Sequence, residues 1–255
     1  MSLPAVTVVI PVFNEEAVLP ELCRRLTALF DTQPDCRWSA VLVDDGSRDG
    51  SAAFIRAGAA KDPRFQLVEL SRNFGFQAAL AAGLAQARGS DAIVTMDADL
   101  QDPPEVIPQL VAAWRGGAEV VRAKRRSRAE RGLRRAGFDL FHLLYGRLTD
   151  YPVEPDSGTF GLLGGAAIAA FSQLPERHRF FPGLRAWIGF PTADVLYDRQ
   201  DRAAGKPKQT LPKLLKYAMD GMISFSYRPL RWVTMLGFFV AGKLEMAVPS
   251  YVSLI

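Results

Sequence analysis

The sequence predicts an α/β fold in which a mainly parallel sheet is covered by helices on both faces. Over the first 125 residues, short apolar runs rich in Val and Ile alternate with helical patterns. These runs are apolar at successive positions rather than at every second one, which is typical of strands buried on both faces. The chain has 255 residues and is 49% hydrophobic, so it is long enough to bury one substantial core.

The first elements are read directly from local patterns. Residues 6–10 are all β-branched and predict a strand, which we expect Pro11 to end. A one-faced helix is predicted over 16–30, because apolar residues recur there every three or four positions. The run 40–43 is the second strand, and the turn residues Asp-Asp-Gly-Ser at 44–47 follow it.

The same alternation continues to residue 121. Small residues favour the next helix, β-branched and aromatic residues favour the strands, and two prolines open the last helix, where they cost no hydrogen bond. In order, these elements are a helix at 51–60, a strand at 65–70, a helix at 77–87, a strand at 92–96, a helix at 105–114 and a strand at 119–121.

After residue 125 the pattern loosens. The segment 122–135 holds eight Lys and Arg and one Glu, and it reads either as a solvated loop or as a loop that meets anionic lipid head groups. The apolar stripe at 138–145 fits either an interfacial helix or packing on the core. Residues 150–210 mix turns with short strands, and an amphipathic helix is expected over 211–225.

The C-terminal part differs from the rest of the chain in composition. Its longest apolar run is 232–241, which spans about 15 Å as a helix and covers about half of a bilayer core. We therefore expect no membrane span in this sequence. The predicted parse is one domain over 1–228 and an incomplete membrane-associated segment over 229–255, with basic amphipathic helices toward the C-terminus.

Charge is unevenly divided along the chain. Residues 1–110 carry 9 Lys and Arg against 15 Asp and Glu, whereas residues 111–255 carry 22 against 12. A basic C-terminal half favours an anionic partner. Nucleic acid, a phosphorylated small molecule and an anionic membrane surface all have this charge, so composition leaves the three open.

Several familiar motifs are absent. No two glycines lie two residues apart, which excludes the GxGxxG dinucleotide fingerprint, and the two histidines lack metal-ligand spacing. The segment 237–243 imitates a P-loop, but Leu244 replaces its Ser or Thr. Cys23 and Cys36 form no CxxC pair, and we expect Cys23 to be a buried core thiol.

Acidic residues gather where predicted strands end. Asp44 and Asp45 follow the second strand, and Asp97 and Asp99 follow the fourth. Ligands of parallel sheets bind outside the carboxyl ends of the strands, so we expect these carboxylates to be exposed in a crevice. The Asp97-Ala98-Asp99 spacing suits Mg²⁺ or Mn²⁺. The alternatives are tight turns, with Asp102 capping the helix that follows.

Taken together, these motifs resemble a known family. The chain is similar to family 2 glycosyltransferases of the GT-A fold, in the subgroup of polyprenyl-phosphate and dolichol-phosphate hexose synthases. The resemblance covers about residues 5–231. The segments that carry it are VVIPVFNEE, VLVDDGSRDGS, LSRNFGFQAAL, IVTMDADLQDPPEVIP, DSGTF, ERHRFFPGLRAWIGF and DGMISFSYRPLR.

The resemblance implies roles for individual residues. It places donor binding at Pro11, Phe13, Glu15, Val43, Asp45, Asp97, Ala98 and Asp99. It assigns the divalent ion, Mg²⁺ or Mn²⁺, to Asp97, Asp99 and Gln101. It gives phosphate binding to Arg125, Arg202 and Lys208, and catalytic roles to Asp99 and Asp156.

This sequence departs from the family pattern at several positions. Phe13 replaces a common Tyr, Phe76 replaces a polar residue, and Gly161 stands where relatives usually have Arg. Gly-Lys-Pro-Lys-Gln at 205–209 differs from the usual Gly-Glu-Ser-Lys-Tyr. Relatives continue into two membrane helices, whereas here Lys and Glu interrupt the apolar run after residue 242.

The resemblance implies a metal-dependent, inverting transfer of a hexose from a nucleotide-diphosphate sugar to a polyprenyl phosphate. UDP-glucose and undecaprenyl phosphate are the first expectation, and GDP-mannose or an aminopentose donor is the alternative. The implied place is the cytoplasmic face of the cell membrane, with peripheral attachment to an anionic surface and homo-oligomerisation left open. A nucleic-acid-binding protein and a non-catalytic sugar-nucleotide-binding module are the rival classes. The acidic strand ends disfavour nucleic acid as a partner.

Overall fold

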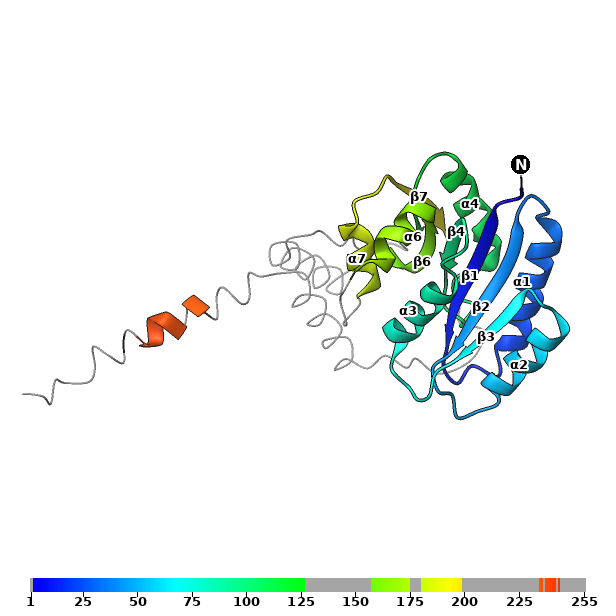
Figure 1. The fold of residues 1–255 in the computed structure, drawn as a ribbon, viewed down its shortest axis with the longest axis horizontal. Helices are drawn as coiled ribbons and strands as arrows, with labels where there is room; N and C mark the ends of the chain where they lie inside the picture. The colour runs from blue at the N-terminus through cyan, green and yellow to red at the C-terminus, as the bar shows by residue number, and fades with distance from the viewer. Residues whose placement is uncertain are drawn as a thin grey trace, which may run out of the picture. The chain divides into compact units, whose positions relative to one another are not determined.

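The fold is described from a computed structural model of the chain (Figure 1). The structure describes residues 2–126, 157–174, 180–198, 234–235, 237–241 and 243. The chain divides into two compact units, one of Met1–Glu130 with Val153–Lys208 and one of Arg131–Pro152 with Gln209–Ile255. The predicted boundary between residues 228 and 229 and the helices expected at 138–145 and 211–225 lie outside the described residues.

The described residues form a seven-stranded sheet with the order β3-β2-β1-β4-β6-β5-β7. β6 runs antiparallel to β4 and β5, and the other neighbouring strands are parallel. The mainly parallel sheet is therefore confirmed. The strands are β1 (Ala5–Val12), β2 (Arg37–Asp44), β3 (Phe65–Glu69), β4 (Ala92–Thr95), β5 (Val120–Arg125), β6 (Ser157–Gly164) and β7 (Thr192–Tyr197).

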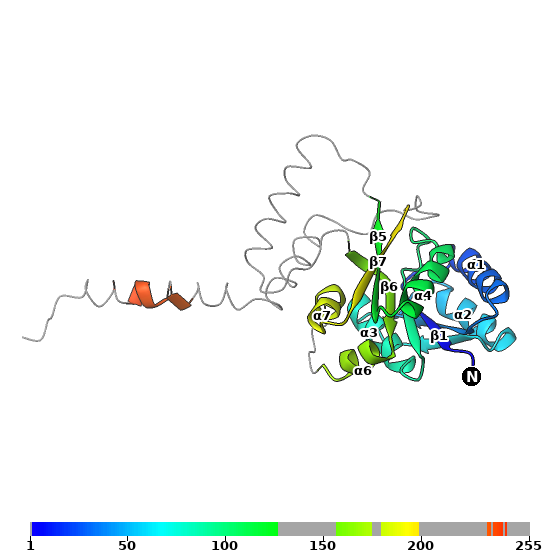
Figure 2. The ribbon, with the colours of Figure 1, turned by 90° about the horizontal axis from the view of Figure 1, so that it is seen from above.

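Helices cover both faces of the sheet, as the apolar runs predict. Figure 2 shows α1, α2 and α4 on one face and α3, α6 and α7 on the other. The helices are α1 (Leu19–Thr32), α2 (Ser51–Lys61), α3 (Phe76–Gln86), α4 (Ile107–Arg115), α6 (Gly165–Ser172) and α7 (Phe181–Trp187), with a 3₁₀ turn η1 (Pro104–Val106) before α4.

The core explains why the central strands are apolar at successive positions. Val8 and Ile10 of β1 pack with α1 on one face, and both are completely buried. Val9, between them, faces α3, where a Cβ on Gly83 would lie 2.3 Å from Val9 Cγ1 and 2.9 Å from Val43 Cγ2. Glycine in α3 thus lets this helix approach β1 and β2 closely.

The prediction that Pro11 ends the first strand is wrong. β1 continues to Val12, and Pro11 pairs with Val43 in the parallel register. The Val9 carbonyl accepts a hydrogen bond from Met96 N, so the main-chain polar groups of Val9 face β4. Pro11 lies two residues further along β1, and its nitrogen therefore faces the same side. The β1–β4 ladder ends at Val9 and Thr95, and the missing N–H of Pro11 therefore faces no strand partner there.

The strand predicted at 119–121 is also longer than expected. It runs from Val120 to Arg125, because it pairs with β6 on one side and β7 on the other. Both partners come from the stretch that the sequence describes only as turns and short strands. The length of β5 is set by these distant partners and not by its own residues.

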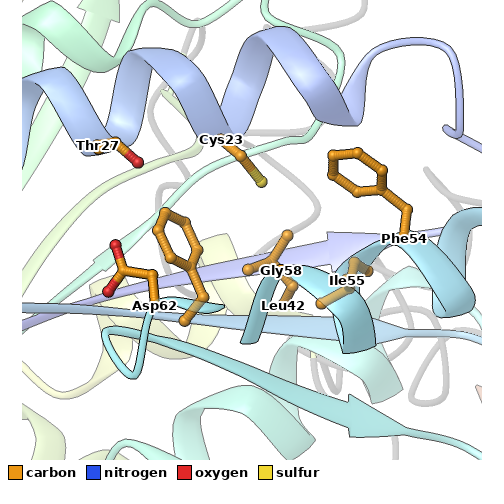
Figure 3. A pocket seen from close by; sticks show the side chains of 8 residues that line it. Cys23, Thr27, Leu42, Phe54, Ile55, Gly58 and Asp62 are labelled. Atoms are coloured by element: carbon orange, nitrogen blue, oxygen red, sulfur yellow. The ribbon is translucent and has the colours of Figure 1, made fainter. Parts of the chain in front are cut away.

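A cavity of about 150 Å³ lies between α1, α2 and the sheet (Figure 3). Cys23, Leu42, Phe54 and Phe65 are among its lining residues. Cys23 was expected in the core but is half-buried at this cavity, and burial raises the pKa of its thiol to about 11. Cys36 is buried, and both cysteines are free.

No helix within the described ranges is long and apolar enough to cross a membrane. In the second unit, the described residues of 234–243 are helical. Their side chains Met235, Phe238 and Phe239 are exposed.

Candidate active site

The loops after β1 and β2 are joined by hydrogen bonds at the carboxyl edge of the sheet. Asn14 N donates to Ser47 Oγ at 2.9 Å, and Arg48 N donates to Asn14 Oδ1 at 2.8 Å. Glu15 N donates to Ser51 Oγ at 3.0 Å. Asn14 has φ 53°, a left-handed conformation that asparagine tolerates better than most residues. The two loops therefore form one preorganised surface.

Asp44 and Asp45 at this edge are buried, which contradicts the expected exposure. Asp44 is 2% and Asp45 3% exposed. Asp45 accepts hydrogen bonds from Phe74 N at 2.7 Å and Gly75 N at 2.9 Å, so it holds the loop after β3 in place. Asp44 Oδ2 accepts from Ser47 N at 3.0 Å, which confirms the tight-turn interpretation for this residue. Their carboxylates satisfy main-chain donors instead of facing solvent.

The other residues expected to bind a donor divide into two groups. Phe13 and Glu15 are half-buried on the joined loops and reach the surface of the edge. Pro11 is buried within β1, and the Val43 side chain is completely buried beneath α3. Direct contact of the Val43 side chain with a base is thus not supported, because that side chain has no accessible surface. Val43 supports the edge by packing.

The segment after β4 brings the Asp97–Asp99 pair into the same edge. Asp97 is half-buried and accepts a hydrogen bond from Thr159 Oγ1 at 3.2 Å. Asp99 is 7% exposed, against the expectation for strand-end carboxylates, and accepts from Gln101 N at 3.1 Å. Ala98 between them is 4% exposed. Gln101 thus orients Asp99 through its main chain.

Asp102 does not cap the following helix, contrary to the alternative drawn from the sequence. Pro103 precedes η1, and no side chain caps this turn. Asp102 is 1% exposed and accepts a hydrogen bond from the Tyr197 hydroxyl at 2.5 Å. The partner of this carboxylate is therefore a residue of β7 that lies 95 positions further along the chain.

Burial and like charge perturb the ionisation of Asp97. Its pKa is raised to about 7, first by burial and then by the carboxylates of Asp102 and Asp99. The Thr159 hydrogen bond and the positive charge of Arg125 act in the opposite direction. Carboxylates crowded in this way gain from a bound cation, which offsets their repulsion.

The donor set of this edge fits a hard divalent ion that shares its coordination with a substrate. Asp97 and Asp99 offer carboxylate oxygens, the ligands that Mg²⁺ and Mn²⁺ prefer. In the described part of the chain, no three His, Cys, Asp or Glu side chains converge on one metal position. Oxygens of a bound substrate would supply the further ligands.

Arg125 ends β5 beside these carboxylates, and its Nε donates to the Tyr197 hydroxyl at 3.3 Å. Thr159 and Tyr197 are site residues that sequence reasoning missed. Each comes from a strand of the second half of the chain. Thr159 lies in the DSGTF segment that carries the resemblance, which was a signal for it, whereas no quoted motif contains Tyr197. The expected site residues Asp156, Arg202 and Lys208 lie outside the described residues.

The raised pKa of Asp97 predicts how stability depends on pH. Because the folded state holds this proton more tightly than the unfolded chain, the stability contributed by Asp97 falls as pH rises from about 4 to about 7. Replacing Asp97 by asparagine removes that loss. In EDTA, the free energy of unfolding of Asp97→Asn minus that of the wild type is expected to rise by on the order of 1 kcal/mol when the pH is raised from 5 to 8. Urea denaturation at the two pH values measures the difference, and an unchanged difference would contradict the prediction.

Comparison with known proteins assigns the family. The family model for "Glycosyl transferase family 2" matches residues 7–169. The chain belongs to glycosyltransferase family 2. This glycosyltransferase is 38% identical to the "Uncharacterized glycosyltransferase YkcC" of Bacillus subtilis (strain 168), over 97% of this chain and 77% of that protein. It is also 38% identical to the "Bactoprenol glucosyl transferase" of Shigella phage SfV, over 93% of this chain and 77% of that protein.

Solved structures confirm the fold of this glycosyltransferase. The mannosyltransferase PcManGT from Pyrobaculum calidifontis, solved in complex with GDP-Man and Mn²⁺, aligns with a TM-score of 0.54 at 18% identity, over 80% of this chain and 59% of that chain. Mannosyl-3-phosphoglycerate synthase from Rubrobacter xylanophilus aligns with a TM-score of 0.53 at 19% identity, over 98% of this chain and 79% of that chain. The expected GT-A architecture of the α/β sheet is thereby confirmed.

Proposed function

We propose that this glycosyltransferase moves a hexose from a nucleotide-diphosphate sugar to a polyprenyl phosphate, with inversion and with Mg²⁺ or Mn²⁺. UDP-glucose and undecaprenyl phosphate are the proposed substrates. The observation that carries the proposal is the 38% identity, over 93% of the chain, to a protein named bactoprenol glucosyl transferase. The acidic pair Asp97 and Asp99 beside Arg125 supports it, because a diphosphate is held well between a hard cation and a guanidinium.

In this proposal the donor lies along the joined loops and the segment after β4. Phe13 and Glu15 contact the nucleoside, and Asp45 shapes the pocket through the loop at Phe74 and Gly75. Asp97, Asp99 and Gln101 would hold the metal ion, which would offset the negative charge that grows on the departing nucleotide diphosphate. The buried surroundings of Asp99 strengthen this electrostatic effect.

The acceptor side requires no proton-abstracting residue. A phosphate monoester has a second pKa of about 6 and is largely dianionic at neutral pH, so its oxygen attacks the sugar already deprotonated. Arg125, Arg202 and Lys208 are proposed to orient phosphates, and Asp156 to position the acceptor or the sugar. We place the reaction at the cytoplasmic face of the cell membrane, with peripheral attachment to an anionic lipid surface. A homo-oligomer is compatible with this arrangement.

The proposal is tested by transfer assays with purified protein and radiolabelled donors. UDP-glucose and GDP-mannose are each supplied with undecaprenyl phosphate in anionic vesicles and with MnCl₂. We expect label in the organic phase with UDP-glucose. Label from GDP-mannose instead would replace the donor and keep the reaction class. Donor binding without transfer to any lipid phosphate would favour a non-catalytic sugar-nucleotide module.

A further inference from the structure

Three residues from distant parts of the chain form a hydrogen-bonded chain at the edge of the active site, with Asp102 and Tyr197 buried and Arg125 half-buried. Arg125 comes from the end of β5, Tyr197 from the end of β7, and Asp102 from the segment after β4. Arg125 Nε donates to the Tyr197 hydroxyl at 3.3 Å, and this hydroxyl donates to Asp102 Oδ1 at 2.5 Å. Tyr197 therefore links the acidic segment to the basic residue opposite it.

The direction of these hydrogen bonds is determined by chemistry. A guanidinium can only donate and an ionised carboxylate can only accept, so the hydroxyl between them must do both. Burial and the Asp102 carboxylate raise the pKa of Tyr197, which keeps its phenol protonated and able to donate. Phenylalanine, which lacks the hydroxyl, could not join the two groups in this way.

The phenol ring is held firmly. Tyr197 is 4% exposed, and its ring packs edge-on against Phe160 with centroids 5.4 Å apart. On its other side, Arg125 lies next to Gly158 of β6, where an added Cβ would be 3.5 Å from Arg125 Nη2. A rigid partner of this kind reduces the entropy that a long arginine side chain loses when it binds an anion.

Neighbouring basic residues of the same strand are held differently. Arg122 and Lys124 both form ion pairs with Asp194, at 2.7 Å and 2.8 Å. Arg125 Nε instead donates to the uncharged Tyr197 hydroxyl, and this partner does not neutralise the positive charge of the guanidinium. Its two Nη groups form the fork that recognises phosphate oxygens.

We propose that Tyr197 is a positioning residue that holds the Arg125 guanidinium in the orientation that binds phosphate, with Asp102 fixing the Tyr197 hydroxyl. The inference rests on the proposed role of Arg125 as a phosphate ligand. It adds a residue of β7 to the substrate-binding machinery and explains why Asp102 is turned away from the helix that follows it. The ligand chemistry is a phosphate or diphosphate group.

Pyrophosphate binding in EDTA tests this role without requiring metal, nucleotide or lipid acceptor. The variants are Tyr197→Phe, Arg125→Ala and the double variant. Arg122→Ala is the matched control, because it removes the same charge from the same strand without touching Tyr197. Calorimetry measures the dissociation constants, and thermal unfolding midpoints show whether each variant is folded.

We expect Tyr197→Phe to weaken pyrophosphate binding by about tenfold and Arg122→Ala to change it by less than about twofold. Added to Arg125→Ala, Tyr197→Phe should cause no further loss, because it acts through that arginine. Wild-type affinity in Tyr197→Phe, an equal loss in the Arg125→Ala background, or no binding by the wild type would overturn the inference. Failure of lipid glycosylation would leave this binding result unaffected, so the two proposals fail separately.

Discussion

Replacement of Asp99 by asparagine is expected to lower glycosyl transfer by about a thousandfold while the protein remains folded. Asparagine keeps an Oδ1 atom that can accept the hydrogen bond from Gln101 N, so the local turn survives. What is lost is one negative charge next to the proposed metal, where charge on the leaving diphosphate is stabilised. Steady-state rates at saturating MnCl₂ measure the loss, and unfolding midpoints report on the fold.

Asp62→Asn is a matched control for this substitution. Asp62 Oδ1 accepts from Arg64 N at 3.0 Å, the same two-residue turn that Asp99 makes with Gln101 N, but Asp62 lines the cavity between α1 and α2. We expect Asp62→Asn to keep transfer within about twofold of the wild type, because Asp62 precedes β3 at the amino edge of the sheet, away from the carboxyl edge that holds Asp99. EDTA should abolish wild-type transfer, and Mg²⁺ or Mn²⁺ should restore it. Full activity in EDTA would contradict the metal assignment.

Lipid phosphates are expected to be glycosylated at least about a thousandfold faster than the matching lipid alcohols. A phosphate dianion attacks without losing a proton, whereas an alcohol needs a general base, which commonly contributes about 10²–10⁴-fold. The comparison uses undecaprenyl phosphate and undecaprenol in the same vesicles with the same labelled donor. The product is separated by chromatography.

Substitution of Asp156 distinguishes attack by a phosphate dianion from attack by an alcohol that a general base deprotonates. If the acceptor is already deprotonated, Asp156→Asn should slow transfer less than Asp99→Asn does. Efficient transfer to undecaprenol that is lost in Asp156→Asn would instead identify Asp156 as a general base. That outcome would assign the acceptor to the alcohols.

The α/β fold class was predictable because the central strands carry a strong local signal. β1 and β2 are apolar at successive positions, and this requires burial on both faces. Strand ends were less predictable. Pro11 stays within β1 because β4 has already ended beside it, and this fact depends on a register between residues 86 positions apart, such as Val9 and Thr95. β5 extends to Arg125 for a similar reason.

The candidate site divides in the same way. The spacing Asp97-Ala98-Asp99 at a strand end predicted a paired acidic site, because two alternate residues after a strand lie at one edge of the sheet. The burial of Asp45 and Asp99 was not predictable. Each accepts main-chain hydrogen bonds, and a carboxylate that does so can be buried, whereas its residue type alone suggests exposure.

The sequence by itself determined the alternation of strands and helices, the acidic residues at the carboxyl ends of β2 and β4, and the family. The strands, helices and acidic strand ends depend on residues that are close together along the chain, and the family is recognised from short motifs, each of which is local in the sequence. The tertiary structure alone decided that Tyr197 joins Arg125 to Asp102 and that Thr159 supports Asp97. These contacts connect residues 62 to 95 positions apart, and such pairs are created by strand order and register, which leave no periodic pattern in the sequence.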